Sequence, residues 1–141
     1  MRHLLSLILG LFLVAPALAG DDETVRLNAG DDAACWSERP VLVELFTSQG
    51  CPLCPDANRY LGELDRHENV FALAYAVSYW DMYGWADTYA RPEYVQRQRN
   101  YLPNLGAPRP YTPHFIVDGV VDAPGWNQDQ VSQIVDERLQ A

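Results

Sequence analysis

The chain has 141 residues, of which 48% are hydrophobic and 21% are charged, so it is long enough for one domain and too apolar to be wholly disordered. All 10 basic residues are arginine, which excludes Schiff-base chemistry on lysine and a P-loop lysine. The 19 acidic residues give a formal charge of −9, which argues against electrostatic binding to nucleic acid or to an anionic membrane surface.

The N-terminus has the three parts of a secretory signal peptide. Arg2 and His3 provide a basic start, residues 4–14 are apolar, and the small-residue pattern Ala-Leu-Ala follows at 17–19. The apolar run is shorter than the ~20 residues of a membrane-spanning helix, which favours a cleaved signal over an uncleaved anchor. We therefore expect residues 1–19 to be removed and the mature protein to be periplasmic or secreted, without a membrane partner. Cysteine pairs persist as disulfides in such a compartment.

Residues 20–40 are acidic and show no sustained periodicity, so we expect a flexible arm ahead of a domain over residues 41–141. Cys35 lies on this arm and is the odd member of three cysteines. Its role stays open between a regulatory disulfide, a bond between two chains and a free thiol.

The first half of the domain contains two apolar runs separated by a helical pattern. Residues 41–46 are almost wholly apolar, which is typical of a strand that is covered on both faces. Apolar residues at positions 57, 60, 61 and 64 have the spacing of one helix face. Residues 70–77 have the length and composition of a second buried strand.

The second half predicts a helix, a hairpin and a final helix. Pro92 suits the first turn of a helix that extends to Leu102, with Pro103 in the irregular connection that follows. Asp118-Gly119 favours a tight hairpin turn, and Asn127 with Gln130 resembles a capping box. This order predicts an α/β fold in which a mixed sheet is flanked by helices. The first two strands are parallel and the last two are antiparallel.

The motif Cys51-Pro52-Leu53-Cys54 lies where the first strand gives way to the first helix. The free N–H groups and positive end of a helix N-terminus stabilise a thiolate, which is the nucleophilic form of cysteine. We therefore expect Cys51 to attack a substrate disulfide and Cys54 to resolve the mixed disulfide that forms on it. This exchange uses no cofactor. Its partners are cysteine-containing proteins or small thiols and a redox partner.

Three other interpretations of the two cysteines stay open. They form a static disulfide, or they belong to a redox-inert binding module. In the third interpretation they are half of a copper or zinc site, with Cys35 and either His114 or His67 as further ligands. The second cysteine pair that is usual for structural zinc is missing, so we predict no metal.

The order of the elements over residues 41–140 resembles the thioredoxin superfamily. The segments Val43 to Pro55, Tyr79-Trp80-Asp81 and Tyr111-Thr112-Pro113 resemble, more narrowly, the secreted bacterial family DUF1223, which is thioredoxin-like by fold and has no settled substrate. The resemblance implies a thioredoxin-like fold, with a central mixed sheet flanked by helices.

The resemblance also implies roles for single residues. Cys51 matches the exposed attacking cysteine, and Cys54 matches the resolving one. Pro113 matches a cis proline that faces the active site, and Thr112 offers backbone hydrogen bonds to a bound peptide, with a trans bond in an ordinary loop as the alternative. Glu44 resembles the buried carboxylate that accepts the proton of the resolving cysteine. One residue more than in thioredoxin separates this acid from the cysteines, so an outward-facing, solvated Glu44 stays open.

Aromatic residues are dense between Tyr79 and Tyr89, and Trp80 is among them. These rings either line a groove for substrate polypeptide, because rings bind many sequences at little entropic cost, or pack into the core under a long loop. His114 follows Pro113 directly, and either approaches the cysteines or lies on the surface.

Overall fold

The computed structural model describes residues 39–141, so the expected signal peptide, most of the expected arm and Cys35 lie outside the described residues. In the described part no helix is long and apolar enough to cross a membrane. In chain order the elements are β1 (Val41–Thr47), α1 (Cys54–Leu64), β2 (Val70–Ala76), the 3-10 helix η2 (Ser78–Tyr83), α2 (Pro92–Leu105), β3 (His114–Val117), β4 (Val121–Pro124) and α3 (Gln128–Leu139).

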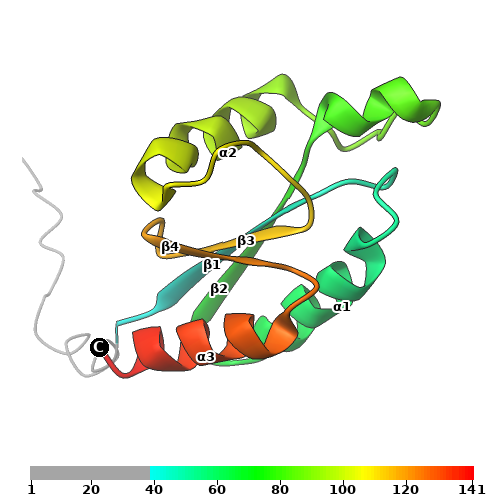
Figure 1. Ribbon diagram of the computed structural model, residues 1–141. Helices are drawn as coiled ribbons and strands as arrows, with labels where there is room; N and C mark the ends of the chain where they lie inside the picture. Colours follow the sequence, from blue (N-terminus) through cyan, green and yellow to red (C-terminus); the bar gives the residue numbers. More distant parts are fainter. Residues whose placement is uncertain (1–38) are drawn as a thin grey trace, which may run out of the picture.

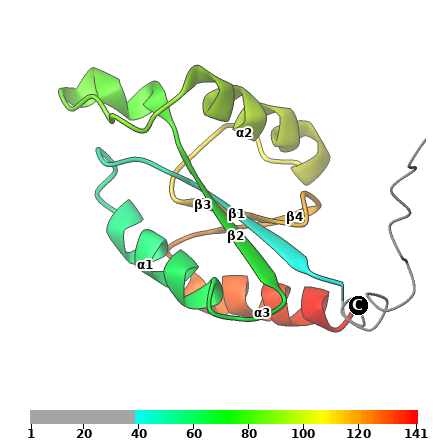
Figure 2. The ribbon, with the colours of Figure 1, turned by 180° about the vertical axis from the view of Figure 1, so that it is seen from behind.

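The four strands form one mixed sheet in the order β2-β1-β3-β4. β1 is parallel to β2 and antiparallel to β3, and β3 is antiparallel to β4. Both ribbon views place α2 on one side of the sheet and α1 with α3 on the other (Figure 1 and Figure 2). The predicted mixed sheet with flanking helices is confirmed, and the arrangement is consistent with a thioredoxin-like fold.

β1 is the central strand and is covered on both faces, as its apolar run predicts. Successive side chains of a strand point to opposite faces of the sheet. Val43 and Leu45 pack into the cluster that contains residues of α1 and α3, whereas Phe46 packs with Val95 of α2. Glu44, which shares the face of Phe46, is fully buried as well. The two helix layers are therefore both built against this one strand.

The prediction of a buried second strand is wrong for most of β2. This strand lies at the edge of the sheet, and Phe71 and Leu73 are 56% and 43% exposed. On the same face only Tyr75, farther along the strand, joins the cluster that α2 covers. An apolar composition does not distinguish a central strand from an edge strand that is left partly uncovered.

α2 is longer than its sequence predicts, because it continues through Pro103 to Leu105. The missing N–H of this proline removes one helical hydrogen bond, the one to the carbonyl four residues earlier, and the helix ends soon after it. The helix ends at Gly106, whose φ of 67° is left-handed and whose N–H donates to the carbonyl of Leu102.

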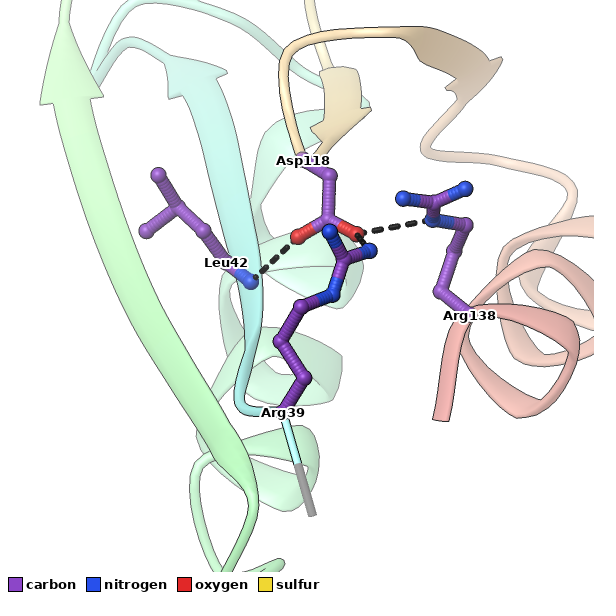
Figure 3. A network of polar contacts seen from close by, with 4 residues as sticks. All are labelled: Arg39, Leu42, Asp118 and Arg138. Carbon is purple, nitrogen blue, oxygen red and sulfur yellow. Dashed lines mark hydrogen bonds and ion pairs between the residues drawn. The ribbon is translucent and has the colours of Figure 1, made fainter. Parts of the chain in front are cut away.

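The turn between β3 and β4 is tied to β1 and α3 through Asp118 (Figure 3). Asp118 and Gly119 have φ values of 51° and 71°, which a tight primed turn requires. The Asp118 carboxylate accepts hydrogen bonds from the Leu42 N–H at 2.9 Å and from Arg138 Nε at 2.7 Å, and Arg39 lies 3.3 Å away. The backbone N–H of Asp118 donates to the Leu42 carbonyl at 2.8 Å, so the predicted turn also extends the pairing of β1 with β3.

Gly125, which follows β4, allows Pro113 to lie close to α1. Its N–H donates to the Pro113 carbonyl at 2.9 Å. A Cβ atom at this position would lie 2.7 Å from Cβ of Pro113 and 3.0 Å from Cβ of Ala57 on α1. No side chain fits there, so a glycine is required where these three segments meet.

We expect Gly125→Ala to lower the free energy of unfolding by about 1–3 kcal/mol, because the added methyl group overlaps Pro113 and Ala57. Gly62→Ala is the matched control. It adds the same methyl group on α1 with nothing within 4 Å, and it should raise the free energy of unfolding by about 0.5–1 kcal/mol. Urea unfolding followed by tryptophan fluorescence measures both effects. Equal changes in the two variants would contradict the packing described for Gly125.

Candidate active site

Cys51 and Cys54 form a disulfide at the start of α1, with their Cα atoms 5.4 Å apart. The helix begins at Cys54, so Cys51 precedes it by three residues, and the N–H of Cys54 donates to the Cys51 carbonyl at 3.2 Å. Pro55 occupies the first turn, where its missing N–H removes no helical hydrogen bond. The sequence places the motif at the helix start correctly, but only its second cysteine is helical.

The turn before Cys51 is held by hydrogen bonds. The N–H of Gly50 donates to Oγ of Ser48 at 3.1 Å, and the N–H of Cys51 donates to the Ser48 carbonyl at 3.2 Å. The N–H of Gln49 donates at 2.7 Å to the carboxylate of Asp87, a residue that is only 6% exposed. Cys51 is therefore positioned by its own turn and by the loop that follows η2.

Cys51 is far less exposed than the resemblance implies. It is 2% exposed and Cys54 is completely buried, whereas Leu53 between them is 56% exposed. η2 packs against the residue before Cys51, because a Cβ atom on Gly50 would lie 3.3 Å from Cβ of Trp80. The approach to Cys51 is thus bordered by η2 and by the exposed Leu53.

The peptide bond between Thr112 and Pro113 is cis, as the resemblance implies. Nε1 of Trp80 donates to the Thr112 hydroxyl at 2.7 Å, and the same tryptophan packs on Gly50. Pro113 in turn lies close to α1, because both it and Ala57 pack against Gly125. The structure therefore brings Trp80, Thr112, Pro113 and both cysteines into one region.

A groove of about 540 Å³ opens beside this region, between η2 and the segment that leads to β3. Within η2, Met82 and Tyr83 are 80% and 73% exposed. Of the two uses that the sequence leaves open for the aromatic segment, lining a groove applies to part of it, because Tyr79 and Trp80 also pack with residues of the core. The groove is lined by the aromatic residues Tyr79, Trp80, Tyr83 and Tyr111 and by Met82, Arg109, Pro110 and Thr112.

Trp126, which lies in the loop before α3 and is 58% exposed, was not among the residues predicted from the sequence. Its ring contacts that of Tyr111, with centroids 5.8 Å apart. Arg109 in the groove was missed as well. The available signal for Trp126 was its position directly after a glycine at the end of the predicted hairpin.

The structure places Glu44 away from the cysteines, on the face of the sheet that α2 covers. Its Oε1 accepts a hydrogen bond from Nε of Arg97 at 2.6 Å, and its Oε2 accepts one from the Tyr101 hydroxyl at 2.6 Å. The adjacent Val43 and Leu45 face α1 instead. Because side chains alternate along a strand, the one-residue difference from thioredoxin turns this acid to the opposite face. Glu44 is buried as expected, but its bonds attach α2 to β1.

A hydrogen-bond network joins the side chains of Glu44, Arg97 and Tyr101, each bonded to the other two. The Tyr101 hydroxyl also accepts a hydrogen bond from Nη2 of Arg97 at 3.0 Å, and the guanidinium lies 5.1 Å from the ring centroid of Tyr75. Burial, together with the hydrogen bond to Glu44, raises the pKa of Tyr101 to about 12. The hydrogen bond to Glu44 raises the pKa of Arg97. The buried carboxylate thus keeps a charged donor and a neutral donor at ordinary pH.

His114 lies neither at the cysteines nor on the surface, since it is fully buried under α2. Its Nε2 lies 2.9 Å from the Asp122 carboxylate, and its Nδ1 lies 3.1 Å from Nε2 of Gln98. The same Gln98 amide donates to the Tyr111 carbonyl, and its oxygen accepts from the Tyr79 hydroxyl, which fixes the orientation of the amide. Nδ1 of His114 must therefore accept, so the ring is neutral with its proton on Nε2.

His114 is already bonded on both ring nitrogens, and Cys35 lies outside the described residues. Over residues 39–141 no group of three or more His, Cys, Asp or Glu side chains is placed to hold a metal ion. The structure therefore does not bring His114 to the cysteines as a third ligand.

We expect Arg97→Met to lower the free energy of unfolding by about 2–3 kcal/mol, because the fully buried Glu44 carboxylate loses its charged donor. Arg99→Met is the control on the same helix, since Arg99 is exposed and has no ion pair within residues 39–141. Chemical denaturation should show a change of less than about 0.5 kcal/mol for that control. Similar losses in both variants would show that the pair with Glu44 does not anchor α2.

Burial lowers the pKa of His114 from its usual 6.5. Below pH 6.5 His114 binds a proton more readily in the unfolded chain than in the folded protein. The stability that neutral His114 contributes is therefore complete above pH 6.5 and is lost as the pH falls below it. We expect the free energy of unfolding to fall by up to about 1.4 kcal/mol per pH unit on this account. His114→Gln should flatten that slope, and His67→Gln at the exposed end of α1 should keep it. An unchanged slope in His114→Gln would contradict the assignment.

Comparison with known proteins identifies the family. A family model described as "Protein of unknown function (DUF1223)" matches residues 42–141. The crystal structure of protein AGR_C_4864 from Agrobacterium tumefaciens is similar to this chain, with a TM-score of 0.65 and 36% sequence identity over 71% of this chain and 45% of that one. This chain thus spans less than half the length of that relative. No curated protein matches the sequence. The match of the family model over most of the sequence shows that the chain belongs to the DUF1223 family.

Proposed function

We propose that this protein is an exported thiol–disulfide oxidoreductase that acts on cysteine-containing proteins or small thiols. The observation that carries the proposal is the Cys51–Cys54 disulfide at the start of α1, in one region with the cis bond before Pro113 and an open aromatic groove. Export is the part of the proposal that rests on the N-terminal sequence pattern, which lies outside the described residues.

The exchange proceeds in two balanced steps. In the reduced protein the Cys51 thiolate attacks one sulfur of a substrate disulfide, forming a bond to that sulfur while the other leaves as a thiolate. The Cys54 thiolate then attacks Sγ of Cys51, which closes the internal disulfide and releases the second substrate thiolate. The substrate is reduced by two electrons and the protein is oxidised. The reverse sequence oxidises a dithiol, and a redox partner restores the starting form.

The start of α1 provides the stabilisation that a thiolate needs. Leu53 occupies the N-cap position, and its side chain supplies no capping hydrogen bond to the first turn. The N–H of Cys54 already donates to the Cys51 carbonyl and Pro55 has none, so the proposal relies on the positive end of the helix as a whole. Since the chain has no lysine and His114 faces α2, the helix terminus carries this role in our proposal.

Cys54 suits the resolving role because it is completely buried within the first turn of α1. It reaches Cys51 without rearrangement of the backbone, since the two Cα atoms are already 5.4 Å apart. Cys51 is 2% exposed, so the two roles are assigned from the positions of the cysteines before and within the helix rather than from their exposure. We therefore assign capture of substrate to Cys51 and release to Cys54.

An insulin-reduction assay tests the proposal. It compares three proteins that all carry Cys35→Ser: one with both remaining cysteines, one with Cys51→Ser and one with Cys54→Ser. We expect Cys51→Ser to lose exchange entirely. We expect Cys54→Ser to trap substrate as a stable mixed disulfide with no turnover, because the internal attack is missing. Mass spectrometry of the trapped species identifies Cys51 as the bonded residue.

Two outcomes would overturn the proposal. One is equal activity of the wild-type protein and Cys51→Ser. The other is stoichiometric Cu(I) or Zn in protein purified under reducing conditions, together with no exchange activity, which would favour the metal-binding interpretation of the two thiols.

A further inference from the structure

We infer that the groove beside η2 selects extended polypeptide substrates that carry an acidic side chain and an apolar side chain near the reactive cysteine. This inference rests on the proposed function, and it adds a substrate class to it. The groove supplies both the apolar contacts and an unpaired positive charge.

Trp80 connects the groove with the turn that carries the reactive cysteine, since it borders both. This residue packs on Gly50, the neighbour of Cys51, with 3.3 Å between its Cβ and a Cβ placed on that glycine. It donates to the Thr112 hydroxyl at 2.7 Å, and it also lines the groove. A polypeptide joined to Cys51 therefore enters a groove that extends away from the cysteine along η2, which a chain of residues fills better than a small thiol does.

The walls of the groove are suited to apolar side chains. The rings of Trp80 and Tyr83 are 5.3 Å apart and tilted by 50°, and the second of them is 73% exposed. Such rings offer large, rigid contact areas that many side chains fit. Met82, which is 80% exposed, adapts to residues of different shape because its side chain is unbranched and flexible. These walls favour an apolar residue without requiring one particular residue.

Arg109 is the charged residue among those that line the groove, and it has no ion-pair partner within residues 39–141. Two acids that adjoin or contact residues of the groove wall, Asp81 and Asp122, have partners other than Arg109. Asp122 interacts with His114 and Tyr111, and the carboxylate of Asp81 accepts the N–H of Asp87. The other arginines are paired with carboxylates at Arg39, Arg59, Arg97 and Arg138 or lie outside this groove.

The positive charge of Arg109 is opposite in sign to the net charge of the whole protein. A formal charge of −9 repels an acidic polypeptide at a distance. Once the polypeptide lies in the groove, a carboxylate beside Arg109 gains a local partner, whereas a lysine at the same place meets a like charge. The contact acts over a short range and depends on where the acidic residue stands relative to the cysteine. It therefore fixes the register of the substrate.

Binding of short peptides to the full protein tests the inference separately from redox exchange. The peptides contain phenylalanine beside a serine in place of the reactive cysteine, and Glu, Gln or Lys at each nearby position. Quenching of tryptophan fluorescence gives the dissociation constants. We expect the best-placed Glu peptide to bind about two- to five-fold more tightly than its Gln counterpart, and Lys to bind more weakly, as for an exposed ion pair. In about 0.5 M salt the difference should shrink.

Charge reversal at Arg109 provides the matched comparison. Arg109→Glu should invert the order of the Glu and Lys peptides. Arg66→Glu makes the same change in net charge at an exposed arginine beyond the far end of α1, with no ion-pair partner within residues 39–141, and it should leave the order unchanged. Equal affinity for the Glu and Lys peptides, or the same inversion in both variants, would overturn the inference. Serine peptides do not react, so this result stands apart from the outcome with Cys51→Ser.

Discussion

A carboxylate that is fully buried in the middle of a sheet requires hydrogen-bond donors. Both donors to Glu44, Arg97 and Tyr101, lie on α2. This requirement fixes α2 across β1 at a defined height and rotation. Arg97 and Tyr101 lie one helical turn apart, so together they select one face of the helix. The layer on this side of the sheet thus combines a buried charge with an apolar cluster, whereas the cluster on the side that holds α1 and α3 consists of buried hydrophobic residues.

The position of α2 also determines the position of one wall of the groove. Gln98 lies on the same helix and is completely buried. Its amide donates to the Tyr111 carbonyl and contacts His114, so the segment that leads to β3 is attached to α2 at the point where it lines the groove. The polar network under α2 and the wall of the groove are therefore parts of one arrangement.

Local signals in the sequence predict the parts of the structure that depend on neighbouring residues. The turn at Asp118 and the cap at Asn127 are confirmed, because each is decided within a few residues. The two-sided burial of β1 is confirmed as well, although the similar run of β2 shows that composition alone does not decide it. The face that Glu44 occupies was not predictable in this way, since a shift of one residue reverses it. The exposure of β2 depends on how far α2 extends over the sheet, and the position of Arg109 depends on an irregular connection without periodicity.

The cluster around Asp118 has a mechanical consequence. Arg39 lies at the beginning of the described segment and Arg138 near its end, and both contact the same carboxylate in the β3–β4 turn (Figure 3). These contacts attach the start of β1 and the end of α3 to this turn, which the N–H and carbonyl of Leu42 hold in line with the central strand. The beginning and the end of the described domain are therefore held together at the end of the sheet opposite its cysteines.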